Sequence, residues 1–335
     1  MNRKGQIRNY IIKKSVLIIP TILGITFLIF LFINFSPSST AQSENLFSKN
    51  ISSLNNIVGE YFSWIKNVFS LNFGKSLRDG RDVFEKIIER LPATLELNFM
   101  ALFFTIIIGI PLGVYQAARI NSKFDKTATF FTFVFYSMPA FWLGLILVIF
   151  IGVILPEFSS RVLGFPIGLP TSDRRSLSII LYPDRYSFFS VFLDRLKHLI
   201  LPAFTYSVVN IAVIARYVRS NMSSILKEDY VITARAKGIE EKKVLFKHAL
   251  KNSLISTITF IAFLIPNIIG SSFIIEVVFS WPGIGRLGYT SIISRDYPVV
   301  MAIGFIIAII TMFSNLFADI LYYYFDPRIR LKNEA

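Results

Sequence analysis

Few side chains in this sequence are suited to catalysis or to metal binding. The chain has no cysteine, and its two histidines are His198 and His248, so a thiol nucleophile is excluded and material for a metal centre is scarce. His198 precedes an apolar run and is interpreted as an interfacial side chain, while His248 lies among lysines without an acidic or histidine partner at ligand spacing. The tripeptide GKS at 74–76 matches only the end of a phosphate-binding loop, because Phe69 stands where that loop requires a further glycine. We therefore expect no catalytic residue, no metal site and no cofactor in this chain, and no nucleotide hydrolysis by it.

The most informative polar segment is 228–251, which reads EDYVITARAKGIEEKKVLFKHALK and lies between two apolar stretches. Its first part holds good helix formers and predicts a helix over 228–237. Gly238 can adopt the left-handed conformation that ends a helix, so a second helix is predicted from Ile239. A short amphipathic helix of this kind fits a groove on another protein. The residues expected along one side of it are Tyr230, Ala234 and Lys237.

The elements that must hold this segment are predicted to be membrane-spanning helices. The 335-residue chain is 53% hydrophobic, 15% aromatic and only 17% charged, with a mean hydropathy of +0.58, which exceeds the usual values for a soluble domain. A helix needs about 20 mostly apolar residues to cross the hydrocarbon core. We therefore predict an all-α integral membrane protein with six transmembrane helices. The six stretches that meet the demand are 15–35, 94–118, 128–155, 199–217, 253–279 and 299–325.

Basic residues are distributed unequally between the two sides of the predicted membrane. With six spans both termini share a side, and that side also includes the loops 119–127 and 218–252. These segments hold more than half of the chain's 35 lysines and arginines. By the positive-inside rule, both termini and the segment around Gly238 are predicted to be cytoplasmic. The net charge of +14 is then explained by topology and by attraction to anionic headgroups, without a nucleic-acid partner.

The predicted spans divide the chain into regions. Basic residues ahead of the first apolar run have the outline of a secretory signal, but the run is longer than a usual signal core, so we expect an uncleaved first span. The partly apolar stretch 176–193 is interrupted at Pro183 and is predicted to be interfacial or extracytoplasmic. The regions are a cytoplasmic N-terminal segment (1–14), a first transmembrane helix (15–35), an extracytoplasmic region (36–93), a core domain with five transmembrane helices (94–325) that contains the cytoplasmic loop 218–252, and a cytoplasmic tail (326–335).

Polar residues within the apolar stretches are the candidates for a water-filled pathway. Glu96 and Glu276 fall near the outer ends of two spans and are predicted to lie in the headgroup or interface region. Asp319 is deeper and is expected to bond a neighbouring helix or to line a pore. The alternative for each candidate is helix packing, because small and polar side chains also join helices. The candidate pathway residues are Ser137, Tyr206, Asn210, Asn267, Ser271, Glu276 and Asp319.

An outer turn is predicted in the segment 278–287, VFSWPGIGRL. Its proline and glycines favour a turn followed by a short surface or re-entrant helix. Trp281 suits the membrane interface, where an amphipathic ring is favoured. A purely structural turn explains the same residues.

Several motifs along the chain resemble one family of transport proteins. They are IPTILGITFLIF at 19–30, FGKSL at 73–77, ERLPATLEL at 89–97, GIPLGV at 109–114, MPAFWLGL at 138–145, HLILPA at 198–203, TARAKG at 233–238, HALKNSL at 248–254, EVVFSWPGIGRLG at 276–288, RDYPVV at 295–300 and DPRIR at 326–330. Together they resemble the first of the two permease subunits of ATP-binding-cassette (ABC) importers of the dipeptide and oligopeptide type, a group with nickel and glutathione relatives. The general pattern of the family's loop has an acidic residue and two alanines ahead of the glycine, where this chain has Ile232, Thr233 and Ala234 before Gly238, so the acidic residue is missing here.

This resemblance implies a type I ABC importer permease fold in which the chain forms half of a translocation pore, as a multi-pass protein of a bacterial cell membrane. The implied partners are a homologous second permease in a heterodimer, two cytoplasmic ATPases that bind ATP and Mg, an extracytoplasmic substrate-binding protein, and membrane lipids. The coupling helix that contacts an ATPase would comprise Tyr230, Thr233, Ala234, Arg235, Ala236, Lys237, Gly238 and Ile239. The outer gate and receptor-facing surface would include Trp281, Pro282, Gly283 and Arg286.

The function expected from the sequence is a non-enzymatic permease subunit that imports di- and oligopeptides delivered by an extracytoplasmic receptor. One alternative is the same machinery carrying nickel, a metal chelate or glutathione, because selection rests largely with the receptor. Another is an ion-coupled secondary transporter that works without ATPases. That alternative expects matched broken helices in two repeated halves and buried ion-binding carboxylates, and neither is evident in the sequence.

Overall fold

The computed structural model describes residues 3–34, 54–270 and 272–325, and over these residues the chain is built from helices and connecting turns. The helices are α1 (Arg3–Asn34), α2 (Leu54–Phe69), α3 (Val83–Ala118), α4 (Lys123–Ser137), α5 (Ala140–Ile149), α6 (Leu155–Leu163), α7 (Leu177–Leu181), α8 (Phe188–Ile225), α9 (Asp229–Ala236), α10 (Glu241–Lys243), α11 (Leu250–Gly270), α12 (Phe273–Val278), α13 (Ile284–Ile293) and α14 (Tyr297–Phe325). Short π-helical segments join α5 to α6 and α10 to α11.

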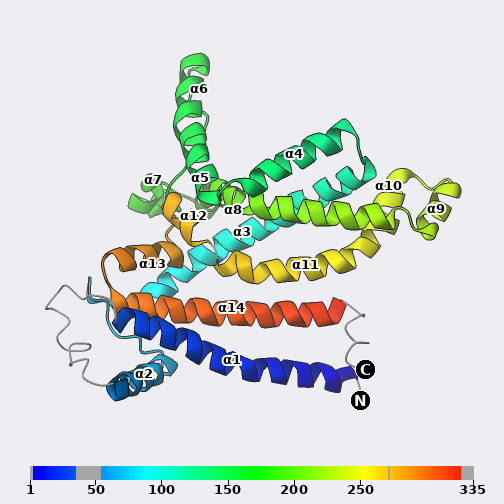
Figure 1. Cartoon of the computed structure of the whole chain (residues 1–335). Coiled ribbons are helices and arrows are strands. Elements are labelled where there is room, and N and C mark those ends of the chain that lie inside the picture. The colour runs from blue at the N-terminus through cyan, green and yellow to red at the C-terminus, as the bar shows by residue number, and fades with distance from the viewer. Residues whose placement is uncertain (1–2, 35–53, 271, 326–335) are drawn as a thin grey trace.

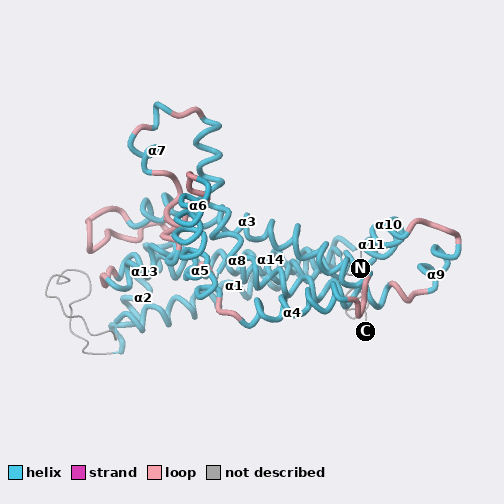
Figure 2. Tube along the Cα trace, turned by 90° about the horizontal axis from the view of Figure 1, so that it is seen from above, coloured by secondary structure: helices cyan, strands magenta, loops and turns pink. Residues whose placement is uncertain are grey.

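Five long helices, α1, α3, α8, α11 and α14, lie roughly alongside one another and form the body of the molecule (Figure 1). Within it α3 packs on α8, α11 on α14, and α14 on α1. One end of this bundle carries α9 and α10 together with the start of α1 and the end of α14, and the opposite end carries α2, α7, α12 and α13, as the view from above also shows (Figure 2). The described ends of α1 and α14 thus share a side with α9, as the distribution of basic residues predicts.

Four described helical stretches are long and apolar enough to cross a membrane: Val83–Ala118, Ala140–Leu163, Phe188–Ile225 and Tyr297–Leu321. A fifth apolar stretch, Val16–Leu31, is shorter. Two of these helices extend beyond the predicted spans, because α3 and α8 each begin about eleven residues ahead of them. The stretch 176–193 does not span, since it is divided between α7, a 3₁₀ turn at Pro183–Arg185 and the first turns of α8. The multi-pass membrane protein that composition predicts is therefore confirmed.

The predicted third span, 128–155, is wrong as a single helix. α4 ends at Ser137, Met138 is extended (φ −85°, ψ 127°), and α5 begins after Pro139. Proline lacks the NH that a helix interior requires, and its ring disfavours the helical conformation in the preceding residue, so the break falls at Met138. The candidate span here is Ala140–Leu163 instead, and its outer part, α6, projects away from the bundle (Figure 1). Only 11% of the apolar part of this helix is buried inside the protein, against 72% of the apolar part of α8. The helix therefore has few packing partners within the chain.

Three apolar clusters hold the described helices together. One joins α1, α2, the start of α3 and α14 around Phe30, Ile87 and Phe305. A second joins α3, α8 and the outer turn around Leu97, Phe279 and Trp281. The third lies at the end that carries α9, around Ile214, Met222 and Val244. The predicted cytoplasmic segment around Gly238 therefore packs in the third cluster, and the predicted outer turn around Trp281 packs in the second.

Candidate coupling helix and outer turn

The helix α9 is ended by Gly238, as the sequence predicts. Gly238 has φ +73°, and its NH donates to the carbonyl of Arg235 (2.9 Å) while the NH of Ile239 donates to the carbonyl of Ala234 (3.3 Å). This pair of bonds is the Schellman motif, which satisfies the last carbonyls of a helix and requires a left-handed residue after it. The chain then turns into α10 and the π-helical segment Val244–Ala249, which leads into α11. The predicted pair of helices meeting at Gly238 is confirmed.

Two residues of α9 anchor it to the body of the protein. Val231 is fully buried and Ala234 is 6% exposed, and the three-residue spacing places both on the same side of the helix. They pack in the third apolar cluster with Val244 and Leu245 after the turn, and with Met222 of α8. α9 therefore packs against α8 and against the π-helical segment that leads into α11.

The three residues predicted along one side of α9 differ in exposure. Tyr230 and Lys237 are exposed, but Ala234 lies on the inner side and is buried. The sequence argument joined three residues by spacing alone, and it had no means of knowing that the apolar cluster would cover the middle one. A role for Ala234 in contact with a partner stays a prediction, and the structure gives its side chain a place in the core. The exposed residues among those predicted for coupling are Tyr230, Thr233, Arg235, Ala236, Lys237 and Gly238, with Ile239 half-buried.

Polar contacts fix the conformation of the exposed face. The guanidinium of Arg235 donates two bonds, of 3.1 and 2.7 Å, to the carboxylate of Glu241 across the turn. The hydrogen bond from Arg235 lowers the pKa of Glu241 and raises that of Arg235. The hydroxyl of Tyr230 accepts a bond of 2.7 Å from the amide of Asn252 in α11. The exposed face therefore carries an aromatic ring and charges of both signs, and these hydrogen bonds connect it to the turn and to α11.

A buried carboxylate that sequence reasoning missed ties α4 to α8 at this same end. Asp125 accepts two bonds of 2.7 Å from the guanidinium of Arg219 and one of 3.0 Å from the backbone NH of Asn121. Its own NH donates to the N-cap Ser122. The pattern of serine followed three residues later by an acid is a recognisable helix-start signal, so the position of Asp125 in a first turn was predictable, although its pairing with Arg219 was not.

The outer turn surrounds a second buried carboxylate, Glu276. Thr94 of α3 and Ser272 donate to its Oε1 from 2.8 and 3.1 Å, and the backbone NH of Arg286 donates to its Oε2 from 3.0 Å. Thr94 in turn accepts from the NH of Ile284, at 2.8 Å. The carboxylate therefore caps the first turn of α13, where backbone NH groups have no partner within the helix. The prediction that Glu276 lies in a wet interface is wrong, because its side chain is fully buried.

Trp281 and Gly283 complete this turn. The predicted turn followed by a short helix is confirmed, with the turn after α12 and the helix as α13. Trp281 is fully buried, contrary to its predicted place at the membrane interface, and its indole NH donates to the carbonyl of Ala93 at 2.7 Å. A Cβ on Gly283 would stand 2.3 Å from the Glu276 carboxylate and 2.5 Å from the Thr94 hydroxyl, so a side chain here is excluded by space. Pro282 is half-buried, and Arg286, also half-buried, donates to the carbonyl of Ser280.

The candidate pathway residues do not share one described site. Glu276 is at the outer turn, whereas Asp319 is near the far end of α14, where it accepts a bond of 2.5 Å from Lys14 of α1. Asp319 therefore bonds a neighbouring helix, which was one of its two predicted roles. Tyr206 is buried in the second apolar cluster, Asn210 is half-buried and Ser137 is exposed at the end of α4. The side chains of Asn267 and Ser271 lie outside the described part of the chain.

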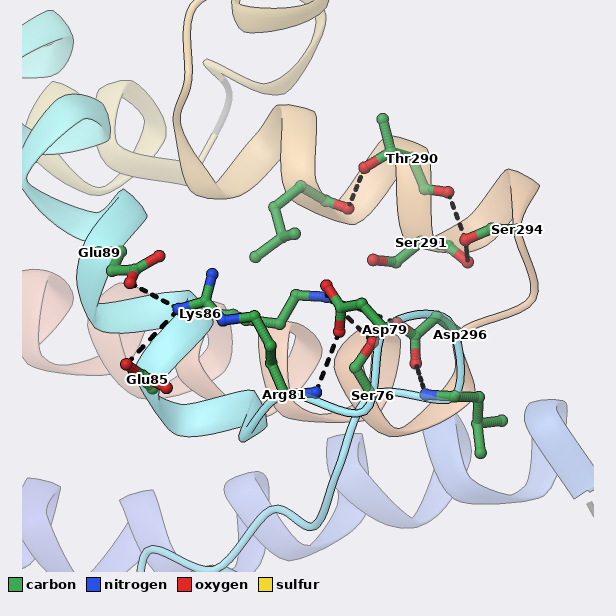
Figure 3. Close-up of polar contacts among 12 residues, drawn as sticks. Ser76, Asp79, Arg81, Glu85, Lys86, Glu89, Thr290, Ser291, Ser294 and Asp296 are labelled. Carbon is green, nitrogen blue, oxygen red and sulfur yellow. Dashed lines mark hydrogen bonds and ion pairs between the residues drawn. The ribbon is translucent and has the colours of Figure 1, made fainter.

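A network of charges holds the outer loop that precedes α3 (Figure 3). The ammonium of Lys86 donates to Ser76 at 2.9 Å and to Asp79 at 2.8 Å, and its side chain is only 10% exposed. Ser76 and the NH of Leu77 donate to Asp296, which precedes α14, at 2.5 and 2.9 Å. The bond from Lys86 is the main cause that lowers the pKa of Asp79 to about 2. The loop is thereby fixed to both α3 and α14.

Glu96 joins three outer segments at the end of the bundle that carries the turn. It accepts two bonds, of 2.9 and 2.6 Å, from Arg174 in the segment between α6 and α7, and one of 3.0 Å from Arg195 of α8. Its side chain is 29% exposed, which is consistent with the interfacial position predicted for it.

Among the described residues, no three histidine, cysteine or acidic side chains form a group able to hold a metal ion.

These features define a class of protein: a multi-pass helical membrane component that presents a short exposed helix ended by a glycine turn at one end and a buried, hydrogen-bonded turn at the other. The chain belongs to the family described as "Binding-protein-dependent transport system inner membrane component", whose pattern it matches over residues 109–331. This is a family of transport components rather than of enzymes.

Curated relatives match this chain over nearly its whole length. It is 40% identical to the oligopeptide transport system permease protein AppB of Bacillus subtilis, with 96% of this chain and 98% of that protein covered. It is 36% identical to the dipeptide transport system permease protein DppB of Alkalihalophilus pseudofirmus and 33% identical to that of Escherichia coli, each with 96% of this chain and 99% of the relative covered. The nickel, glutathione and secondary-transporter alternatives gain no support from these relatives.

Proposed function

We propose that the chain is one permease subunit of an ATP-driven importer of di- and oligopeptides in a bacterial cell membrane. In this proposal it crosses the membrane six times, with both termini in the cytoplasm, and pairs with a homologous second permease. The substrate is delivered by an extracytoplasmic binding protein, and ATP and Mg are bound by two separate ATPase subunits. The names and full-length coverage of the relatives support the peptide substrate.

The observation that carries the proposal is the construction of α9. Its outer face is exposed, its inner face is buried through Val231 and Ala234, and a Schellman turn at Gly238 joins it to the next helix. A helix built only to cover the bundle would not need Tyr230, Thr233 and Lys237 on a solvent face held in one conformation. A ligand-driven change must act through differential contacts with a two-state element. We propose that an ATPase grips α9 and moves α8 and α11 through the third apolar cluster.

The test is peptide uptake by proteoliposomes that contain this chain with its co-purifying subunits. The proposal expects uptake only when ATP is present on the side of the membrane that carries α9. It also requires the binding protein on the opposite side. A dissipated ion gradient should leave the rate unchanged. Uptake that persists without ATP and stops with the gradient would establish the secondary-transporter alternative instead. Uptake of Ni²⁺ or glutathione in place of peptides would support the alternative in which the same ATP-driven importer carries a different substrate.

A further inference from the structure

A groove between α1 and α14 contains two opposite charges. Its volume is about 230 Å³, and its polar lining consists of Lys14 and Thr21 from α1 with Asn315 and Asp319 from α14. The ammonium of Lys14 donates to the carboxylate of Asp319 at 2.5 Å, and the two side chains are 42% and 15% exposed. The rest of the wall is formed by leucine, isoleucine and methionine. The charged pair is therefore reachable from the groove rather than sealed between the helices.

The groove lies where the apolar part of both helices ends. On α1 the apolar stretch Val16–Leu31 begins two residues after Lys14. On α14 the candidate span reaches Leu321, two residues after Asp319, and the sequence continues with three tyrosines at 322–324 before the charged Asp326. Tyrosine is enriched at the level of lipid headgroups. Both charges thus stand at headgroup depth, in the leaflet on the side that carries α9.

This partly exposed ion pair favours a polar neighbour. Charged groups that face hydrocarbon are costly, so a lipid headgroup is a more favourable neighbour for this pair than an acyl chain. A headgroup that carries a phosphate and a primary ammonium complements an adjacent lysine and aspartate, with the phosphate toward Lys14 and the ammonium toward Asp319. Thr21 and Asn315 add a hydroxyl and an amide for the remaining oxygens. Leu17 in the groove wall is exposed, as are Phe313 and Phe317 on α14, and these side chains offer an apolar surface to acyl chains.

We propose that this groove binds one zwitterionic phospholipid with a free amine, namely phosphatidylethanolamine, and that the lipid bridges α1 to α14. The ion pair between Lys14 and Asp319 already joins α1 to α14, and the bound lipid adds further contacts between the two helices. The proposal concerns the membrane, so it does not depend on which solute the protein carries.

The experiment is native mass spectrometry of the full chain, with any subunits that co-purify, released from nanodiscs that contain equal parts of phosphatidylethanolamine, phosphatidylcholine and phosphatidylglycerol. We expect the protein to retain phosphatidylethanolamine selectively, because the trimethylated amine of phosphatidylcholine cannot donate a hydrogen bond to Asp319 and phosphatidylglycerol has no cation. In Asp319→Asn and Lys14→Gln, retention should fall roughly tenfold, as expected for the loss of one charge-assisted hydrogen bond. Lys227→Gln, which removes an exposed lysine at the same end but outside the groove, should retain the lipid as the natural chain does.

Two further variants keep the ion pair and change only the groove. Asn315→Leu and Thr21→Val should lower retention several-fold with little change in thermal unfolding, so the test survives if the charge variants fail to insert. Equal retention of the three lipids by the natural chain overturns the proposal. So does a preference for phosphatidylglycerol, or selective retention that none of the four groove variants alters.

Discussion

The indole NH of Trp281 donates a 2.7 Å hydrogen bond to the backbone carbonyl of Ala93, which lies 188 residues earlier in the chain. This bond joins the outer turn to the first half of α3 at a buried point. The hydrogen bond from Thr94 to Glu276 lies next to it. The turn is thus a rigid part of the bundle. A gate built on it has to move together with α3, α12 and α13.

Gly283→Ala tests how closely this turn is packed. The new Cβ would stand 2.3 Å from a carboxylate oxygen of Glu276, so the carboxylate or the turn must shift. Overpacking of this kind destabilises by about 1 to 3 kcal/mol, which thermal unfolding in detergent measures. The matched control is Gly59→Ala in α2, where nothing lies within 4 Å of the new atom and a gain of roughly 0.5 to 1 kcal/mol is expected. Equal unfolding temperatures for both variants would contradict the described geometry of the turn.

Asp296→Ala tests the charge network that holds the outer loop. Removing the carboxylate leaves the NH of Leu77 and the hydroxyl of Ser76 without their acceptor, at a cost of about 1 to 3 kcal/mol for the buried hydroxyl of Ser76. The loop should then open, and trypsin should cleave after Arg78 or Arg81, both of which are exposed. Asp184→Ala, at an exposed position of another outer segment, is the control. Resistance to trypsin equal to that of the natural chain would show that the network does not hold the loop.

Gly238→Val tests the hinge. Gly238 has φ +73° and open space around an added Cβ, so the expected effect arises from backbone strain, which is on the order of 1 to 2 kcal/mol for an L-residue in this region. We expect the protein to insert in the membrane but to lose substrate-stimulated ATPase activity in the assembled complex. Gly238→Asn should retain most of the activity, because asparagine tolerates the left-handed conformation. Full stimulation in the valine variant would refute the role given to this turn.

Glu241→Gln tests how much the ion pair across the hinge contributes. Both side chains are about half exposed, so water screens the pair, and the expected loss is at most about 1 kcal/mol. The pKa of Glu241 is lowered in the folded protein, so the contribution is present above the ordinary carboxylate range and is lost as the pH falls through the lowered pKa. Thermal unfolding of the two proteins should therefore differ slightly at pH 7 and converge in acid. A difference that grows in acid would have the wrong sign for this account.

Local features of the structure followed from the sequence where a residue type imposes its own geometry. Gly238 ends α9 because glycine takes the left-handed conformation without strain. Four of the apolar stretches contain helices long enough to cross a membrane, whereas the predicted span 253–279 is divided between α11 and α12. The same reasoning applied strictly would have broken the third predicted span at Pro139, where the hydrophobic run continues but the helix does not.

The errors arose where the tertiary fold decides. Whether Trp281 faces lipid or the core depends on α3, which is remote in sequence, and a carboxylate such as Glu276 is tolerated in the interior only because Thr94 and the first turn of α13 are brought to it. Lys86 and Ser76 pair with Asp296, which lies more than 200 positions later in the chain. No local sequence pattern predicts a contact over that distance. The burial of Ala234 likewise depends on Val244 and Met222, which the tertiary fold brings to it.

The central claim, that a separate ATPase grips α9, is tested most directly by site-specific photocrosslinking. The chain has no cysteine, so Thr233→Cys on the exposed face of α9 provides a unique site for a maleimide-linked benzophenone, and Ser294→Cys, exposed at the opposite end, provides the control. In native membranes the account predicts a covalent product with the ATPase subunit from position 233 and none from position 294. Labelling at position 233 that yields only lipid or solvent adducts, in a complex that still transports, would contradict it.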